Sequence, residues 1–349
     1  MTVATQPPDM DGPRPRSAYL EELRGVVPAH WFKRQPRRLW YAAANLSVMA
    51  ACFAVISQTA NDLVCALLAL ISGLCFGSLS LQAHDISHGS VLGRGRLRHA
   101  VELLLWSLAL FPPTMWHVLH NKYHHGNPTL DKDPDRRFTL GERSAATTIY
   151  SALFLPSRLN TKLNPIVLFG GVYLVHVTKN LSFALFGRSG RRPRLLTSAP
   201  AYTPSERRRI AWETLVGLTL HLLLFWLLDF EVERWLWAVI APSMLAAAVL
   251  INYVFLQHSL APPADFDDPM LNATSLEVPA ALDGFHHHIS HHIEHHLFPA
   301  MSSNFYPQLR ELLRERYGSR YRTTSCVEAW RQLWHLEMYI ERRSVVDEG

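Results

Sequence analysis

The sequence predicts an all-α integral membrane protein, in which four transmembrane helices form two hairpins and carry a cytoplasmic helical cap. Three observations support this fold class. Long apolar stretches occur in pairs, very short turns join the two members of each pair, and nearly all basic residues lie outside those turns. The mean hydropathy of +0.02 does not decide the class by itself, because apolar spans and large polar segments average out.

The apolar stretches are long enough to cross a membrane. Three of them contain no charged side chain over at least 21 positions: residues 39–60, 63–83 and 235–257. At about 1.5 Å of rise per residue, each would cross a hydrocarbon core roughly 30 Å thick. The fourth predicted span, residues 210–228, contains Glu213 and His221 but is otherwise dominated by Leu, Phe and Trp.

Charge sets the expected orientation of these spans. Only Asn61 and Asp62 separate the first pair, and residues 229–234 separate the second. Of the 34 Lys and Arg residues, only Arg234 lies in either turn. Because basic residues concentrate in cytoplasmic loops, both termini and the long middle segment are expected in the cytoplasm. The basic residues match no nucleic-acid-binding module, so no nucleic-acid partner is expected.

The remaining segments are predicted to be peripheral. Residues 1–38 are proline-rich and are expected to be a flexible cytoplasmic segment, not a signal peptide. Residues 100–112 are too short to span and contain Glu102, which favours an interfacial or re-entrant helix. Residues 165–187 are interrupted by glycines and a lysine and are expected to lie along the membrane. The four cysteines are not spaced like a disulfide framework or a thiolate metal site.

Histidines cluster in three motifs, "HDISH" at 84–88, "HNKYHH" at 120–125 and "HHIEHH" at 291–296. His84 and His88 stand four residues apart on a helix that continues from the second span, so their side chains share one face and can bind one metal. The last span along the chain, residues 235–257, leads directly to His258. The predicted topology brings all these parts of the chain to the cytoplasmic face.

The number and setting of the histidines point to two redox-active metal ions. A zinc site takes at most four protein ligands, so nine imidazoles imply two ions. Imidazole does not select among Fe, Cu, Zn and Ni. An apolar membrane substrate offers unactivated C–H bonds, which redox-inert zinc cannot oxidise, and this favours iron. The candidate ligands are His84, His88, His120, His124, His125, His258, His292, His295 and His296.

Carboxylates near the clusters are candidates for orienting the ligands. Metal-bound imidazoles usually donate their second N–H to a carboxylate or carbonyl. Asp85 and Glu294 lie within the clusters, and Asp133 lies in "DKDPD", which reads equally well as a polar turn. His117 is a spare histidine, and His221 is expected to bond a neighbouring helix. Four further histidines lie in or beside the dense run before the third motif, and they are not all expected to be metal ligands: His286, His287, His288 and His291.

Over roughly residues 40–325 the chain resembles the membrane fatty acid desaturases and their di-iron oxygenase relatives. The resemblance rests on "HDISH", "HNKYHH" with the following "HHGNPTLDKDPD", and above all "HIEHHLFPAMSSNFYPQL", where Leu-Phe-Pro and Tyr-Pro also match. It implies a desaturase-like domain over residues 39–325 and a cytoplasmic tail over 326–349. It also implies a role for His258, which falls where the family often places an extra ligand.

The resemblance implies a fatty acid desaturase that uses two iron ions, O2 and two external electrons. The substrate would be a fatty acyl lipid or an acyl thioester. No haem-binding segment like cytochrome b5 is found at either end, so the electrons are expected from a separate ferredoxin, or from a cytochrome b5-type protein with its reductase. The absence of an endoplasmic-reticulum retrieval signal favours a bacterial cytoplasmic membrane.

Two alternatives remain open at this point. A lipid hydroxylase or ketolase of the same superfamily would need few changes, because its iron chemistry begins in the same way. A metal transporter would place its ligands near the bilayer midplane on broken, repeat-related helices. The predicted ligands instead gather at one membrane face, which disfavours transport.

Overall fold

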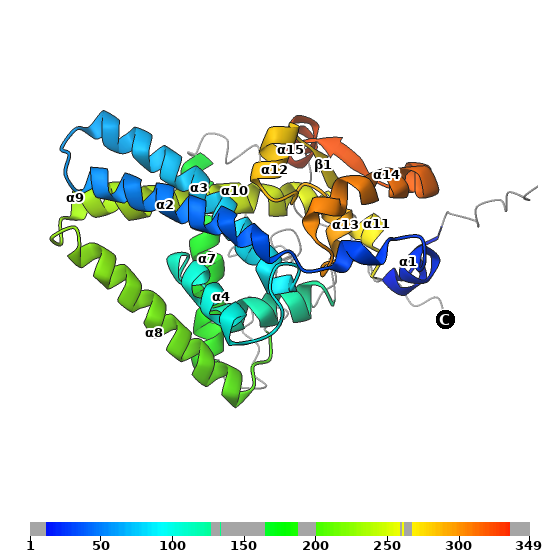
Figure 1. Ribbon diagram of the computed structural model, residues 1–349, viewed down its shortest axis with the longest axis horizontal. Helices are drawn as coiled ribbons and strands as arrows, with labels where there is room; N and C mark the ends of the chain where they lie inside the picture. Colours follow the sequence, from blue (N-terminus) through cyan, green and yellow to red (C-terminus); the bar gives the residue numbers. More distant parts are fainter. Residues whose placement is uncertain are drawn as a thin grey trace, which may run out of the picture.

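Long apolar helices lie at one end of the molecule and shorter helices at the other (Figure 1). The computed structural model describes residues 12–126, 133, 165–187, 200–258, 260–261 and 267–335. Among these residues, three helices are long and apolar enough to cross a membrane: Pro36–Ile56, Asp62–His88 and Val232–His258. They correspond to three of the four predicted spans.

The first hairpin is formed by α2 (Leu39–Ile56) and α3 (Asp62–His88). The side chain of Asn61 caps α3 by accepting hydrogen bonds from the N–H groups of Leu63 and Val64. At the other end, Gly89 adopts a left-handed conformation and terminates the helix. Because α3 begins after Asn61 and ends before Gly89, His84 and His88 lie on its last turns.

Helix α3 packs between α2 and α10 (Ala241–His258). Together, α9 (Val232–Trp235), the π-helical η6 (Leu236–Ile240) and α10 form the continuous helix from Val232 to His258. Gly73 and Gly77 allow close approach. A Cβ atom at Gly73 would lie 2.8 Å from the Leu245 side chain, and one at Gly77 would lie 3.3 Å from Val249. Small residues four apart are typical of tightly packed membrane helices.

The fourth predicted span forms α8 (Pro204–Trp226), which begins with a capping box between Thr203 and Glu206. It is not among the three helices apolar enough to cross, because charged residues occupy its first half. In Figure 1, α8 diverges from α10, and it packs instead on α4 (Arg96–Leu108) and α5 (Pro113–Trp116). His221 Nε2 lies 3.1 Å from the Leu108 carbonyl, which confirms the expected bond to a neighbouring helix.

Two shorter predicted segments also form helices. The stretch around 100–112 forms α4, whose 13 residues are too few to span. The segment 165–187 forms α7 (Pro165–Phe186), which packs on α10 and α8.

The described part of residues 267–335, together with residues 12–38, forms what we call the cap. A two-stranded parallel sheet pairs β1 (Ser275–Glu277) with β2 (Thr323–Ser325), with Ser275 opposite Thr323. The helical elements that follow residue 268 are α11 (Pro269–Asn272), α12 (Ala280–Phe285), α13 (His292–Leu297), η7 (Ser303–Phe305), α14 (Tyr306–Tyr317), η8 (Gly318–Arg320) and α15 (Cys326–His335).

The N-terminal segment differs from the expected flexible entry. Its described part forms α1 (Arg16–Leu23), η1 (Ala29–Phe32) and η2 (Pro36–Arg38). Tyr19 and Leu23 are almost completely buried in one apolar cluster with residues of α13 and α14. Burial of these side chains fixes the described part of the segment against α13 and α14, which the proline content of the segment did not reveal. The predicted C-terminal tail likewise begins as α15, and its residues beyond 335 lie outside the described part.

Candidate metal centre

The nine predicted ligands come from four separate elements that meet where the bundle joins the cap. The end of α3 supplies His84 and His88, and the end of α10 supplies His258. The remaining six come from η3 (His117–His124) with the residue that follows it, and from α13: His120, His124, His125, His292, His295 and His296.

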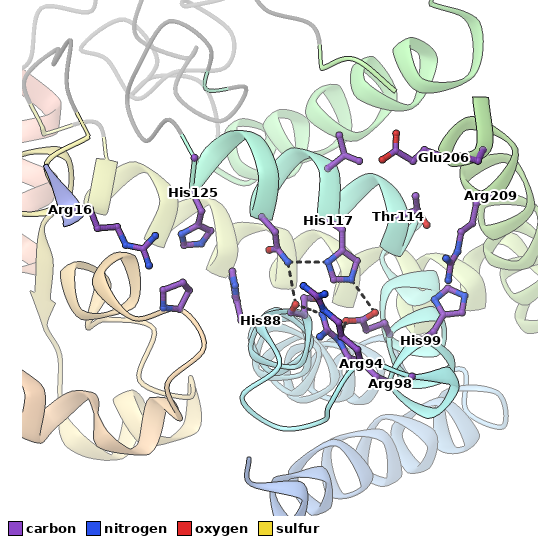
Figure 2. Close-up of a pocket in the computed structure, with 18 residues that line it drawn as sticks. Arg16, His88, Arg94, Arg98, His99, Thr114, His117, His125, Glu206 and Arg209 are labelled. Carbon is purple, nitrogen blue, oxygen red and sulfur yellow. Dashed lines mark hydrogen bonds and ion pairs between the residues drawn. The ribbon is translucent and has the colours of Figure 1, made fainter. Parts of the chain in front are cut away.

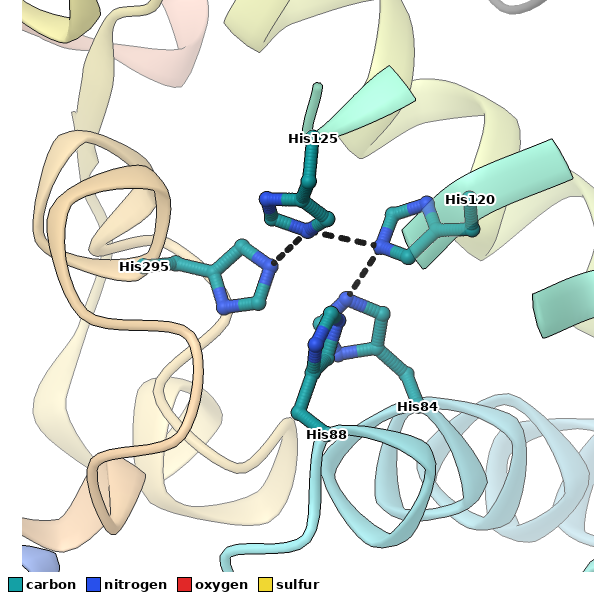
Figure 3. Close-up of side chains that lie close together, drawn as sticks. All are labelled: His84, His88, His120, His125 and His295. Atoms are coloured by element: carbon teal, nitrogen blue, oxygen red, sulfur yellow. Dashed lines mark hydrogen bonds between the residues drawn. The ribbon is translucent and has the colours of Figure 1, made fainter. Parts of the chain in front are cut away.

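These nine side chains divide into two groups. The five-histidine group comprises His84, His88, His120, His125 and His295, and the four-histidine group comprises His124, His258, His292 and His296. Within each group, one nitrogen of every ring lies within 4.8 Å of the others. Figure 3 shows the five imidazoles converging from α3, η3 and α13.

A π-helical turn decides which histidine joins which group. In η3 the N–H of His125 donates to the carbonyl of His120, five residues earlier, at 2.9 Å. This wider turn aligns His120 with His125, whereas an α-helix would align it with His124. His124 therefore belongs to the other group. π-turns of this kind recur at functional sites.

The spacing of the nitrogens in the five-histidine group fits a bound transition metal. His120 Nε2 lies 3.0 Å from His84 Nε2 and 3.2 Å from His125 Nε2. His295 Nε2 lies 3.0 Å from His125 Nε2. Metal–nitrogen bonds of about 2.1 Å at right angles place adjacent ligand nitrogens about 3.0 Å apart. The buried Nε2 of His88 has no hydrogen-bond partner in the described chain, as expected for an atom that a metal would engage.

The four-histidine group has a similar arrangement. His292 Nε2 lies 2.6 Å from His258 Nε2 and 3.2 Å from His296 Nε2. His124 contacts the same rings, with ring centroids 4.7 Å from His258 and 5.0 Å from His296. All four side chains are buried.

The electrostatics favour neutral imidazoles, the form that binds metals. Burial is the main cause, and repulsion between neighbouring rings adds to it. Together, burial and repulsion lower the pKa of five of these histidines well below the ordinary value of an imidazole: His120, His125, His292, His295 and His296. A positive charge on these rings would be both desolvated and opposed by its neighbours.

Three ligands are oriented through their second ring nitrogen. His124 Nδ1 lies 2.9 Å from Asp133 Oδ2, which matches one of the two roles that the sequence left open for Asp133. His295 Nδ1 lies 3.2 Å from the Tyr306 hydroxyl, and His258 Nδ1 lies 3.3 Å from the carbonyl of Asn272. The last two partners were not predicted, although the Tyr-Pro pair after the third motif was a signal for Tyr306. Such contacts fix ring orientation and tautomer.

Of the two other candidate carboxylates, Asp85 contacts the expected histidine and also has other partners, whereas Glu294 has different partners from those expected. Asp85 Oδ1 lies 3.6 Å from His84 Nδ1, but its other oxygen forms a buried ion pair with Arg38 at 2.9 Å and accepts a hydrogen bond from Ser303 at 2.7 Å. Glu294 contacts His291 Nδ1 at 3.4 Å and Ser275 Oγ at 2.7 Å. It therefore supports a histidine outside the nine.

Two histidines of the run before the third motif, and His117 in the second cluster, serve other contacts. His286 lies 3.0 Å from the Tyr253 hydroxyl, and His287 lies between Arg38 and Ser78 at 3.2 and 3.3 Å. His117 Nε2 lies 3.1 Å from Glu102.

A cavity of about 880 Å³ opens beside the five-histidine group (Figure 2). His88 and His125 form part of its wall, and His88 is the only one of the nine candidate ligands that is not fully buried. Four arginines also line the cavity: Arg16, Arg94, Arg98 and Arg209. Glu102 and Glu206 line it as well, and Glu102 is paired with Arg98, so the arginines outnumber the carboxylates at this wall.

The apolar helices and the two convergent histidine groups define a helical membrane protein with a site suited to two metal ions. A family model for fatty acid desaturases matches residues 61–327. The chain belongs to the fatty acid desaturase family.

Several characterised proteins are similar to parts of this chain. The omega-3 fatty acid desaturase of the endoplasmic reticulum from Nicotiana tabacum is 29% identical over 127 residues, which cover 36% of this chain and 34% of the relative. The sn-1 acyl-lipid omega-3 desaturase (ferredoxin) from Synechocystis is 28% identical over 33% of this chain and 32% of its own length. The Delta(12)-fatty-acid desaturase from Arabidopsis thaliana is 23% identical over 68% and 63%. The chain thus spans about a third of the first two relatives.

Proposed function

We propose that this protein is an O2-dependent fatty acyl desaturase whose nine histidines hold two iron ions. The observation that carries the proposal is the division of the nine predicted ligands into one group of five and one of four. Each group has nitrogens at the spacing of a coordination shell. A site for one ion, or a loose histidine-rich tract, would not produce two separate shells.

Bound iron would supply the redox chemistry by which O2, two external electrons and two protons from solvent remove two hydrogens from adjacent acyl carbons, giving a double bond and two waters. The protein's part is to hold and orient the ligands. Asp133, Tyr306 and the Asn272 carbonyl fix three rings. Burial of eight of the nine histidines keeps bulk water away, which protects the site from side reactions.

The substrate in this proposal is a fatty acyl chain attached to a lipid or carried as a thioester. The Synechocystis relative is named as an acyl-lipid enzyme and a ferredoxin enzyme, which supports a lipid substrate and a separate electron donor here. Ferredoxin, or a cytochrome b5-type protein with its reductase, would serve as donor. The arginine-lined cavity beside His88 is open to anionic groups from either a donor or a substrate.

We further propose that four helices cross a bacterial cytoplasmic membrane, with both termini and the cap in the cytoplasm. The three apolar helices and the distribution of basic residues support this arrangement. In it α8 would be the fourth span.

Mass spectrometry of total lipids tests the activity. The full chain is expressed with a ferredoxin and its reductase in a host that lacks related enzymes, and His84→Ala and His296→Ala serve as inactive controls. A desaturase produces an acyl species two mass units lighter, absent from both controls. A species sixteen units heavier would assign the protein to the lipid hydroxylases. Full activity in either variant would overturn the proposed site.

A further inference from the structure

A third group of potential metal ligands lies outside the two histidine groups. It consists of Asp283 on α12 and of His288 and His291 in the turn between α12 and α13. One ligand atom from each lies within 4.8 Å of the others. None of the three belongs to the nine histidines of the proposed iron site.

The geometry of this group resembles part of a coordination shell. His288 Nδ1 and His291 Nε2 point to the same oxygen, Asp283 Oδ2, at 2.7 and 3.2 Å. Ligands bound to one ion at about 2.1 Å and at right angles lie about 3.0 Å apart. Two imidazoles and one carboxylate form a donor set that suits first-row divalent cations such as Zn²⁺.

The outer atoms of two of these ligands are held in place, as in established metal sites. The hydroxyl of Ser290 donates to Asp283 Oδ1, the oxygen that faces away from the histidines. On the far side of the His291 ring, Nδ1 lies 3.4 Å from Glu294 Oε1. Glu294 was predicted to support one of the nine ligands, and in the structure it supports this third group instead.

The backbone of the turn is strained in a way that positions His288. His287 and His288 have φ angles of 55° and 60°, a left-handed region that is uncommon for residues other than glycine. The N–H of His288 donates to the Asp283 carbonyl at 2.8 Å, so the turn folds back on α12. Strain of this kind is concentrated at functional sites and ligand clamps.

The third group also differs from the other two in its access to solvent. The His288 side chain is 22% exposed, whereas the His291 side chain is only 5% exposed. An ion could therefore bind from the surface without passing through either buried histidine group.

We propose that Asp283, His288 and His291 form a third, solvent-accessible site for a first-row divalent cation such as Zn²⁺. The site is separate from the catalytic ions and does not depend on the proposed reaction. Its occupant would fix the turn that leads directly into α13, the helix that carries His292, His295 and His296.

The test is metal counting on the full-length, iron-loaded protein. The wild type and its variants are dialysed against a buffered free concentration of Zn²⁺, and zinc and iron per chain are measured by mass spectrometry. The wild type should take up about one zinc per chain without losing iron. His288→Asn should weaken zinc binding at least tenfold, because it removes the imidazole while asparagine tolerates the left-handed backbone.

Two further variants separate the site from general effects. Asp283→Asn removes the charge but keeps a hydrogen-bond acceptor, and it should lower zinc affinity in the same way. His30→Asn replaces an exposed histidine elsewhere and should bind zinc like the wild type. Equal zinc uptake by the wild type and His288→Asn would overturn the proposal. The proposal would also be overturned if the wild type took up zinc only by losing iron. This second outcome does not depend on whether the variants fold.

Discussion

The three histidines of the second motif show how one backbone detail assigns candidate ligands to different histidine groups. His120 and His124 have the four-residue spacing by which an α-helix presents two side chains on one face. The π-turn closed between His120 and His125 shifts this alignment by one residue. His124 then joins His258 and the two outer histidines of α13, and it is oriented there by Asp133.

The contact between Asp133 and His124 leads to the first prediction. Asp133→Asn removes the charge that orients the imidazole, so iron affinity should fall about 10–100-fold, as for other carboxylate–histidine pairs at metal sites. Iron retained during dialysis against a graded chelator measures the change. Asp62→Asn, at the exposed start of α3, is the control and should behave like the wild type. Equal retention in both variants would show that Asp133 does not tune the site.

His88 and His117 both line the cavity but should differ sharply in effect. His88 has a buried nitrogen without a partner and belongs to the five-histidine group, so His88→Ala should lose most of the activity and part of the iron. His117 is directed to Glu102, so His117→Ala should retain at least about a third of the activity, because it removes no ligand. Iron content and turnover with saturating donor distinguish the two. Similar losses in both would argue that the cavity wall acts as a unit.

At the scale of single residues, the sequence predicts the candidate histidine ligands better than it predicts the groups that contact them. Spacing and the position of the spans were enough to single out all nine histidines that the structure brings together. The division of the nine histidines into groups of five and four depends on the π-turn, and the spacing of the histidines in the sequence does not reveal that turn. Tyr306 meets His295 through the packing of α14 on α13, and the Asn272 carbonyl of α11 meets His258 at the end of α10. Such contacts are set by tertiary structure.

At the scale of elements, the closeness of α3 and α10 determines where His258 lies. Gly73→Ala would place a Cβ atom 2.8 Å from the Leu245 side chain and force the helices apart. We expect a loss of about 1–3 kcal/mol in stability, typical of overpacking, and a larger loss of iron from the four-histidine group that contains His258. Thermal unfolding in detergent and iron content measure both effects. Gly284→Ala, with open space around it, should be neutral or stabilising.

The buried ion pair between Arg38 and Asp85 joins the N-terminal segment to α3. Arg38→Gln would leave the Asp85 carboxylate buried without its cation, which typically costs about 3–5 kcal/mol. It would also remove the Arg38 contact of His287 in the cap. Arg37→Gln is the matched control, because Arg37 is exposed one residue away. An equally small shift in unfolding temperature for both variants would contradict a structural role for the pair.

Elements with strong periodic or compositional signals were predicted well, and those defined by packing were not. Three spans were found because an uninterrupted apolar run of about 20 residues is typical of membrane-crossing helices. The N-terminal segment was expected to be flexible because it is proline-rich. Its described part instead forms α1, an eight-residue helix that gains its stability from burying Tyr19 and Leu23 against α13 and α14. The direction of α8 is set by contacts with α4 and α5 that no local pattern encodes.

At the scale of the whole molecule, the membrane topology depends on whether α8 crosses the membrane. One face of α8 is buried through Ile210, Glu213 and Gly217. Glu213 is satisfied there by the N–H and hydroxyl of Thr114, at 2.8 and 2.7 Å. The opposite face carries an apolar row in which every member is more than half exposed: Trp212, Leu215, Leu218, Leu222 and Trp226. A helix with this division is suited to lie with one face on protein and the other in lipid.

Cysteine accessibility in intact cells tests the four-span arrangement. In a variant with its four native cysteines replaced by serine, single cysteines are introduced at Glu231, between α8 and α9, and at Ser205, at the start of α8. If α8 and the helix from Val232 to His258 both cross, an impermeant maleimide should label position 231 from outside, and position 205 only after permeabilisation. Asn61 should behave like position 231 because it lies in the first short turn. Labelling of both positions from outside would show that α8 does not cross, and labelling of position 231 only after permeabilisation would overturn the orientation of the second pair.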